Sequence, residues 1–203
     1  MNTTRVAYGL TGQIGAGKTY VGKLLSKYGC AVYNADQQAQ HILLSDQELR
    51  AKIAAILGTQ AFTPTGLYNR EYVAQEIFKN PTLRSALEGL IHPAVFADFS
   101  HWKDRCETQL NFVFMESALL PRLNWRPYFR SIVLITAPET LRLQRIIQRD
   151  NTTPQRALER MAAQPTTPEY YQVAHFVLEN SPRFDLTTEV EQLVDILQLQ
   201  NAN

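Results

Sequence analysis

The stretch GLTGQIGAGKT, from Gly9 to Thr19, constrains the fold more than any other part of the chain. Its spacing is that of a phosphate-binding loop, G-x-x-x-x-G-K-[ST]. Glycines let the backbone curl until successive N–H groups point at phosphate oxygens, and the following helix adds the positive end of its dipole. Lys18 is expected to reach the outer phosphates, and the Thr19 hydroxyl to help hold Mg²⁺. The residues predicted to bind nucleotide here are Gln13, Ile14, Gly15, Ala16, Gly17, Lys18 and Thr19.

The residues on both sides of the loop have the pattern that this motif requires. Residues 5–11 form a short, mostly apolar segment, as in a buried strand. Apolar residues then recur at helical spacing from Val21 to Tyr28, and Gly29 ends the run. A strand, a loop and a helix in this order predict a nucleotide-binding α/β protein.

The composition excludes several classes of partner. The 20 Lys and Arg residues balance 19 Asp and Glu residues, which gives no electrostatic case for nucleic acid or an anionic membrane surface. No apolar run is long enough to span a membrane, and the phosphate loop stands where a signal peptide would be apolar. Cys30 and Cys106 lack metal-ligand spacing and are expected to be ordinary thiols. We therefore expect a soluble cytoplasmic protein with no obligate protein partner.

Four further apolar runs predict a parallel sheet. The expected strands are residues 31–33, 111–115, 131–135 and 176–178. The second and third of these runs are almost continuously apolar, as in a sheet buried on both faces. Helices are expected at residues 138–150, 153–164 and 186–197. This alternation predicts an α/β fold of the P-loop nucleotide-kinase type, in which helices flank the sheet.

Residues 37–105 interrupt the alternation with helices and no predicted strand. A capping box at Ser45 and Glu48 predicts one helix start, and Asn80-Pro81 predicts another, which His92-Pro93 is expected to end. The core domain is therefore predicted to comprise residues 1–36 and 106–203, with residues 37–105 as a helical insertion.

Two acidic residues stand at predicted strand ends, where ligands of open α/β sheets bind. Asp36 follows the second strand and could accept a hydroxyl proton or help hold a metal, although it could equally cap a helix. Glu116 follows the third strand and could hold Mg²⁺, as acidic residues do in Walker B sites; the alternative is a solvated strand end.

Five arginines lie on the two predicted helices that follow the fourth strand. They are Arg142, Arg145, Arg149, Arg156 and Arg160. A solvated basic face is the simple explanation. Beside a phosphate loop we favour phosphate contacts for Arg145 and Arg149, because arginine pairs with phosphate in bidentate fashion. A lid at about residues 142–165 would exclude water and favour transfer to a bound acceptor over hydrolysis.

Two other nucleotide-binding classes lack their motifs here. A GTPase switch needs N-K-x-D and D-x-x-G, and an ABC-type ATPase needs a loop such as L-S-G-G-Q; none occurs. A nucleotide-sensing module would not need the arginine-rich helices. A small-molecule kinase is therefore favoured, with the helical insertion as its acceptor site.

The chain resembles the dephospho-CoA kinase family along almost its whole length. The matching stretches are GLTGQIGAGKT, VYNADQQAQ, TGLYNREYVAQEIF, LIHPAV, APETLRLQRIIQRD, RMAAQ and FVLEN. The resemblance implies transfer of the γ-phosphate of ATP to the ribose 3′-hydroxyl of dephospho-CoA, with Mg²⁺. This is the last step of coenzyme A synthesis.

The resemblance also implies roles for single residues. Asp36 matches the catalytic aspartate and Arg145 the lid arginine, while Lys18 acts with them in catalysis. Asn180 lies near the adenine-contacting loop and Arg149 joins the nucleotide-binding set. The residues assigned to the acceptor are Asp36, His92, Arg160 and Gln164. The metal is assigned to Thr19 and Glu116 from the loop motif and the strand end, not from the resemblance. On its chemistry alone, His92 would be structural.

The sequence departs from the family pattern at four places. The usual Asp-x-Asp is Asn34-Ala35-Asp36, the usual Asp-Arg is Asn69-Arg70, and the usual Gly after Asn180 is replaced within Ser181-Pro182. The usual Pro-Leu-Leu-Phe-Glu ends here in Arg122, which leaves Glu116 as the nearest carboxylate. These changes bear on the metal and adenine sites more than on the reaction.

Overall fold

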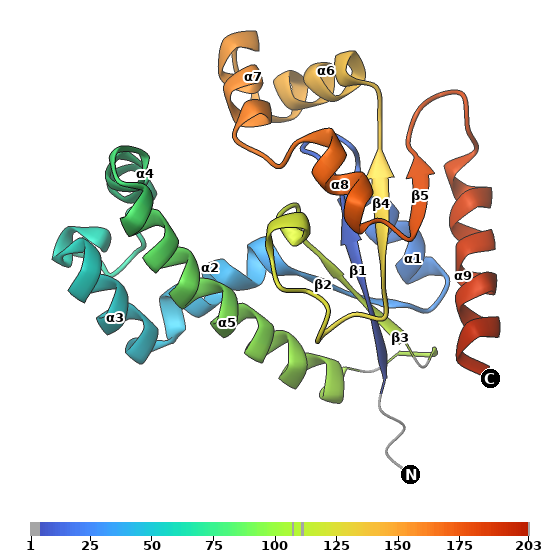
Figure 1. The fold of residues 1–203 in the computed structure, drawn as a ribbon, viewed down its shortest axis with the longest axis horizontal. Helices are drawn as coiled ribbons and strands as arrows, with labels where there is room; N and C mark the ends of the chain where they lie inside the picture. Colours follow the sequence, from blue (N-terminus) through green and yellow to red (C-terminus); the bar gives the residue numbers. More distant parts are fainter. Residues whose placement is uncertain (1–4, 107, 111, 203) are drawn as a thin grey trace. The chain divides into compact units, whose positions relative to one another are not determined.

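Five parallel strands form the sheet that the sequence predicts (Figure 1). The computed structural model describes residues 5–106, 108–110 and 112–202. The strands are β1 (Val6–Thr11), β2 (Ala31–Asn34), β3 (Phe112–Glu116), β4 (Ser131–Thr136) and β5 (Phe176–Glu179). Their order is β2-β3-β1-β4-β5, and every neighbouring pair is parallel. The predicted first residue of the third strand, position 111, lies outside the described residues.

The chain divides into two compact units, Met1–Asn34 with Lys103–Asn203, and Ala35–Trp102. The first unit contains the sheet with α1 (Lys18–Lys27), η2 (Leu120–Arg122), α6 (Glu139–Asp150), α7 (Pro154–Ala162), α8 (Thr167–Val173) and α9 (Leu186–Ala202). Its core joins apolar side chains of α1, α9 and the sheet. Val21, Leu25, Val190 and Leu197 are fully buried there with Tyr8.

The second unit contains α2 (Ala35–Ser45), α3 (Gln47–Leu57), η1 (Thr59–Ala61), α4 (Arg70–Lys79) and most of α5 (Pro81–Arg105). It has a core of its own, with Leu43, Ile53, Val73 and Leu87 buried together. Among its described residues there is no strand, only an isolated bridge between Phe62 and Tyr68 around a tight turn.

Two predicted helix boundaries in this unit are wrong. Asp46, not Ser45, caps α3: its Oδ1 accepts a hydrogen bond from the Leu49 N–H at 2.9 Å, while Ser45 Oγ donates to the His41 carbonyl. His92-Pro93 does not end a helix, because α5 continues through Pro93 to Arg105. Burial of apolar side chains before and after the proline offsets its cost of about 3 kcal/mol.

One helix of the first unit was not predicted from the sequence. The short helix α8 begins at a cap in which Glu169 Oε2 accepts from the N–H and hydroxyl of Thr166, at 2.7 and 2.8 Å. Tyr170 anchors it, since its buried hydroxyl donates to the Ala118 carbonyl at 2.7 Å. Seven residues give too little periodicity to distinguish such a helix from a loop.

Candidate active site

The phosphate loop joins β1 to α1 in the conformation that its glycines permit. Gly12, Gly15 and Gly17 all have positive φ values, which L side chains rarely adopt. A turn closes the loop, because the Ala16 N–H donates to the Gln13 carbonyl at 3.1 Å. A side chain at position 12 would collide with the Ile135 carbonyl, so the glycine is also required by space. The loop therefore has the backbone of a phosphate cradle, and its residues fit a nucleotide phosphate.

The Lys18 ammonium lies against this loop. Its Nζ donates to the carbonyl oxygens of Gly12 and Gln13, at 2.9 and 3.4 Å. Lys18 is also the first residue of α1, so the positive end of the helix dipole and the ammonium charge add together here. Both favour an anion at the loop.

A buried carboxylate joins α1 to two adjacent strands. Glu116 is the last residue of β3 and is only 7% exposed, so the interpretation as a solvated strand end is wrong. Its Oε1 accepts from the Thr19 hydroxyl at 2.7 Å, and its Oε2 from the Asn34 amide at 3.1 Å. A carboxylate and a hydroxyl are hard oxygen ligands that suit Mg²⁺. Within the described part of the chain, no group of three His, Cys, Asp or Glu residues could hold a metal ion.

Arg145 connects α6 to the phosphate loop and to the end of β5. Its Nη1 donates to the Gly15 carbonyl at 3.2 Å, and its Nη2 donates to the Asn180 carbonyl and Oδ1, both at 3.2 Å. The Asn180 amide in turn donates to the Ala16 carbonyl at 2.8 Å. Partial burial lowers the pKa of Arg145 from its usual value. The structure thus brings two predicted site residues, Arg145 and Asn180, onto the loop itself.

Arg149 and Arg160 instead meet at one carboxylate. The Nε and Nη2 of Arg149 donate to the two oxygens of Asp150 at 2.7 and 2.9 Å, and Arg160 Nη1 donates to Asp150 Oδ2 at 2.5 Å. The two arginines hold the pKa of Asp150 well below its usual range. In this conformation the ion pairs of Asp150 with Arg149 and Arg160 therefore connect α6 to α7. Neither arginine contacts the phosphate loop through these bonds. Arg142 is buried, and its Nε donates to the Ala137 carbonyl, so it is not part of a solvated face.

Gln164 also lies on the loop, although it was predicted for the acceptor. Its Oε1 accepts a hydrogen bond from the Ile14 N–H at 2.6 Å. The contact of Gln164 with Arg122 was not predicted from the sequence. Arg122 stands where the family resemblance leads one to expect an acid, and an arginine there suggested no functional role.

The two remaining predicted residues belong to the second unit. Asp36 lies in the first turn of α2, two residues after Asn34. His92 lies within α5, and burial lowers its pKa, opposed by the charge of Glu88. No hydrogen bond from His92 to another predicted site residue is seen within the described residues of this unit.

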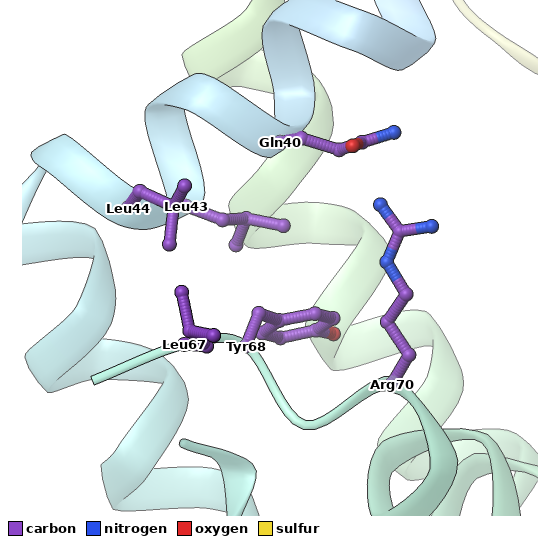
Figure 2. Close-up of a pocket in the computed structure, with 6 residues that line it drawn as sticks. All are labelled: Gln40, Leu43, Leu44, Leu67, Tyr68 and Arg70. Carbon is purple, nitrogen blue, oxygen red and sulfur yellow. The ribbon is translucent and has the colours of Figure 1, made fainter. Parts of the chain in front are cut away.

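The second unit also contains a pocket that the sequence did not reveal (Figure 2). Three leucines and an aromatic ring make most of its lining, and two polar side chains complete it. The residues are Leu43, Leu44, Leu67, Tyr68, Gln40 and Arg70. Figure 2 shows the Arg70 guanidinium and the Gln40 amide on one side of the leucines. Such a lining suits a ligand with an apolar chain and an anionic group.

Comparisons with known proteins point to one family. The family model described as dephospho-CoA kinase matches residues 6–185. A dephospho-CoA kinase of Bacteroides fragilis (strain YCH46) is 30% identical over 95% of this chain and 93% of its own. Among solved structures, a Thermus thermophilus protein has a TM-score of 0.79 at 26% identity, covering 97% of each chain. A dephospho-CoA kinase from Campylobacter jejuni shares the fold, with a TM-score of 0.65 at 21% identity over 96% of this chain and 98% of its own. The match of the family model over most of the chain and the 30% identity with a curated relative show that the chain belongs to the dephospho-CoA kinase family.

Proposed function

We propose that this protein transfers the γ-phosphate of ATP to the 3′-hydroxyl of dephospho-CoA and so forms coenzyme A. The observation that carries the proposal is the family match over residues 6–185, which includes an ordered phosphate loop bonded to Arg145. A different small-molecule kinase is the alternative, and it would use the same loop with another acceptor. A nucleotide-sensing module is less favoured, since it would need neither Arg145 nor a second unit that binds an acceptor.

The phosphates of ATP are proposed to occupy the loop from Gln13 to Thr19. Lys18 would hold the outer phosphates, because its ammonium already lies over the loop. Arg145 would stabilise the charge of the transferring phosphoryl group, and Asn180 would support the adenine end. Arg149 would join them when the lid, about residues 142–165, closes. To contact the phosphates, Arg149 would exchange its hydrogen bonds to Asp150 for bonds to ATP.

The metal is proposed to bind beside Glu116. Thr19 and Glu116 would hold Mg²⁺ directly or through water, with Asn34 orienting the carboxylate through its amide. Mg²⁺ supplies charge neutralisation for the phosphates. These residues fit the ion because Thr19 and Glu116 offer oxygens and are already in contact.

The effect of Glu116→Gln tests this metal site. The change keeps the size of the side chain but removes its charge, so we expect the Mg²⁺ concentration for half-maximal activity to rise by roughly tenfold or more. The measurement is a Mg²⁺ titration at saturating substrates. Glu179→Gln is the control, since Glu179 ends β5 at the same edge of the sheet and bonds to Ser181. Equal Mg²⁺ dependence in both variants would contradict the assignment.

The acceptor is proposed to bind the second unit, residues 35–102. Asp36 would take the proton of the attacking hydroxyl, and His92 and Arg160 would contact the acceptor. The pocket beside Arg70 supports this proposal, because dephospho-CoA combines a pantetheine chain, whose dimethyl and methylene carbons are apolar, with an anionic pyrophosphate. For Gln164 the contact with Ile14 favours a role on the phosphate loop over one on the acceptor.

Arg70→Ala tests the acceptor pocket. Loss of a charge-assisted hydrogen bond should raise the KM for dephospho-CoA by roughly ten- to a hundredfold and leave the KM for ATP unchanged. Initial rates with each substrate varied in turn give both constants. Arg84→Ala is the control, because Arg84 is an exposed arginine of the same unit paired with Glu88. A rise in the KM for ATP instead would place Arg70 with the nucleotide.

We also propose a cytoplasmic location. Cys30 and Cys106 are both free thiols, as expected in a reducing compartment. No helix in the described residues is long and apolar enough to cross a membrane.

A further inference from the structure

The segment between α7 and α8 supports the phosphate loop from outside. Gln164 Oε1 accepts a hydrogen bond from the Ile14 N–H at 2.6 Å. Ile14 lies in the turn that the Ala16 N–H closes on the Gln13 carbonyl. Gln164 thus fixes the orientation of the peptide group in the first half of the loop. A loop whose N–H groups are already oriented for phosphate needs less reorganisation when phosphate binds.

Arg122 holds this supporting segment at two points. It is the last residue of η2, and its Nη2 donates to the Gln164 carbonyl at 3.3 Å. Its Nε donates to Glu169 Oε1 at 3.2 Å, in the first turn of α8. The Thr166 N–H, followed by Arg122, lowers the pKa of Glu169 to about 2. One guanidinium therefore bonds both to the segment that carries Gln164 and to the first turn of the helix that follows it.

We propose that Arg122 is a positioning residue for phosphoryl transfer, which acts through Gln164 on the phosphate loop at Ile14. The proposal rests on the kinase function proposed above. A carboxylate at position 122, as the family resemblance leads one to expect, would repel Glu169 and could not donate to the Gln164 carbonyl. Arg122 thus places a positive charge where the resemblance leads one to expect a negative one. This change allows the bonds to Glu169 and to the Gln164 carbonyl.

Arg122 contributes to loop geometry rather than to folding. The Arg122 and Glu169 side chains are 40% and 35% exposed, and ion pairs so exposed add little stability. Helix α8 has a separate anchor in the buried bond from Tyr170 to the Ala118 carbonyl. Removing Arg122 should therefore loosen the Gln164 segment while the unit stays folded.

A double-mutant cycle tests the proposal. The variants are Arg122→Ala, Gln164→Ala and the two combined, with Arg126→Ala as the control because Arg126 is exposed on the same connection. Gln164→Ala should lower kcat/KM for ATP roughly three- to tenfold, the worth of one backbone hydrogen bond. Arg122→Ala should lower it about two- to fivefold, with the KM for dephospho-CoA and the Tm unchanged. In the Gln164→Ala background, Arg122→Ala should have no further effect.

Two results would overturn the proposal. One is an Arg122→Ala effect that persists in full without the Gln164 side chain; the other is an effect no larger than that of Arg126→Ala. Titration of ATP onto the unmodified protein and the four variants gives a readout that does not depend on the acceptor. If the unmodified protein failed to phosphorylate dephospho-CoA, the proposed function would fail, while the ATP titrations would still decide whether Arg122 acts through Gln164.

Discussion

Asp36→Asn should lower kcat by at least about a hundredfold while the affinity for ATP hardly changes. A ribose hydroxyl is a poor nucleophile at neutral pH, and kinases place an aspartate against it to orient it and take its proton. Asn34 leaves Asp36 as the remaining acid of the pair that the family resemblance leads one to expect. Asparagine keeps the shape of the side chain and removes the proton acceptor. Steady-state kinetics with both substrates, together with ATP titration, measure the two quantities.

The alternative for Asp36 is a structural role at the start of α2. An acid in the first turn of a helix interacts with the dipole, typically by about 0.3–1 kcal/mol, which would cost some stability but no chemistry. Asp46→Asn is the matched control, because Asp46 caps α3 in the same unit and asparagine caps equally well. Turnover by Asp36→Asn close to that of Asp46→Asn would leave the base unidentified, with Glu116 as the next candidate.

Lys18→Ala and Arg145→Ala should affect different kinetic quantities, the first chiefly ATP affinity and the second chiefly kcat. Lys18 contacts the loop carbonyls and should hold the β- and γ-phosphates in both the ground and transition states. Its loss should weaken ATP binding by roughly ten- to a hundredfold in addition to lowering the rate. Arg145 bonds to Gly15 and Asn180 and should act mainly on the transition state. Its loss should lower kcat by roughly a hundredfold or more, with a smaller loss of ATP affinity than for Lys18→Ala.

Nucleotide titrations on both variants, beside kcat from initial rates, decide between the two assignments. Lys23→Ala serves as the control, since Lys23 is exposed on the same helix as Lys18. A greater loss of ATP affinity in Arg145→Ala than in Lys18→Ala would contradict the role of Arg145 and make it a residue that only shapes the loop.

The fold could be predicted from the sequence because its signals are local. The phosphate loop fixes a strand, a turn and a helix by backbone requirements, and the apolar runs of β3 and β4 are typical of a sheet buried on both faces. Proline was a weaker guide: Pro93 was expected to end a helix, but burial of Val95, Phe96 and Phe99 keeps the chain helical. Burial by distant residues is a property that a local pattern does not contain.

The sequence predicted which residues would gather near the phosphate loop, but not which of them bond to one another. Thr19 and Glu116 were both expected near a metal, and the structure adds that they bond to each other. Arg149 and Asp150 are neighbours in sequence, yet their pairing depends on side-chain direction, which a sequence does not give. The contact of Gln164 with Ile14 spans 150 residues, and no spacing rule predicts a bond between positions so far apart.

Release of ADP from MgATP, with and without dephospho-CoA, tests the central claim most directly. A panel of dephospho-CoA, AMP, shikimate and pantetheine phosphate should show ADP formation that depends on the acceptor, with a clear preference for dephospho-CoA. A new phosphate on the ribose 3′-hydroxyl should accompany each ADP formed. Equal ADP release without any acceptor would indicate a plain ATPase, and a preference for another acceptor would indicate a different small-molecule kinase. Either result would contradict the proposed function.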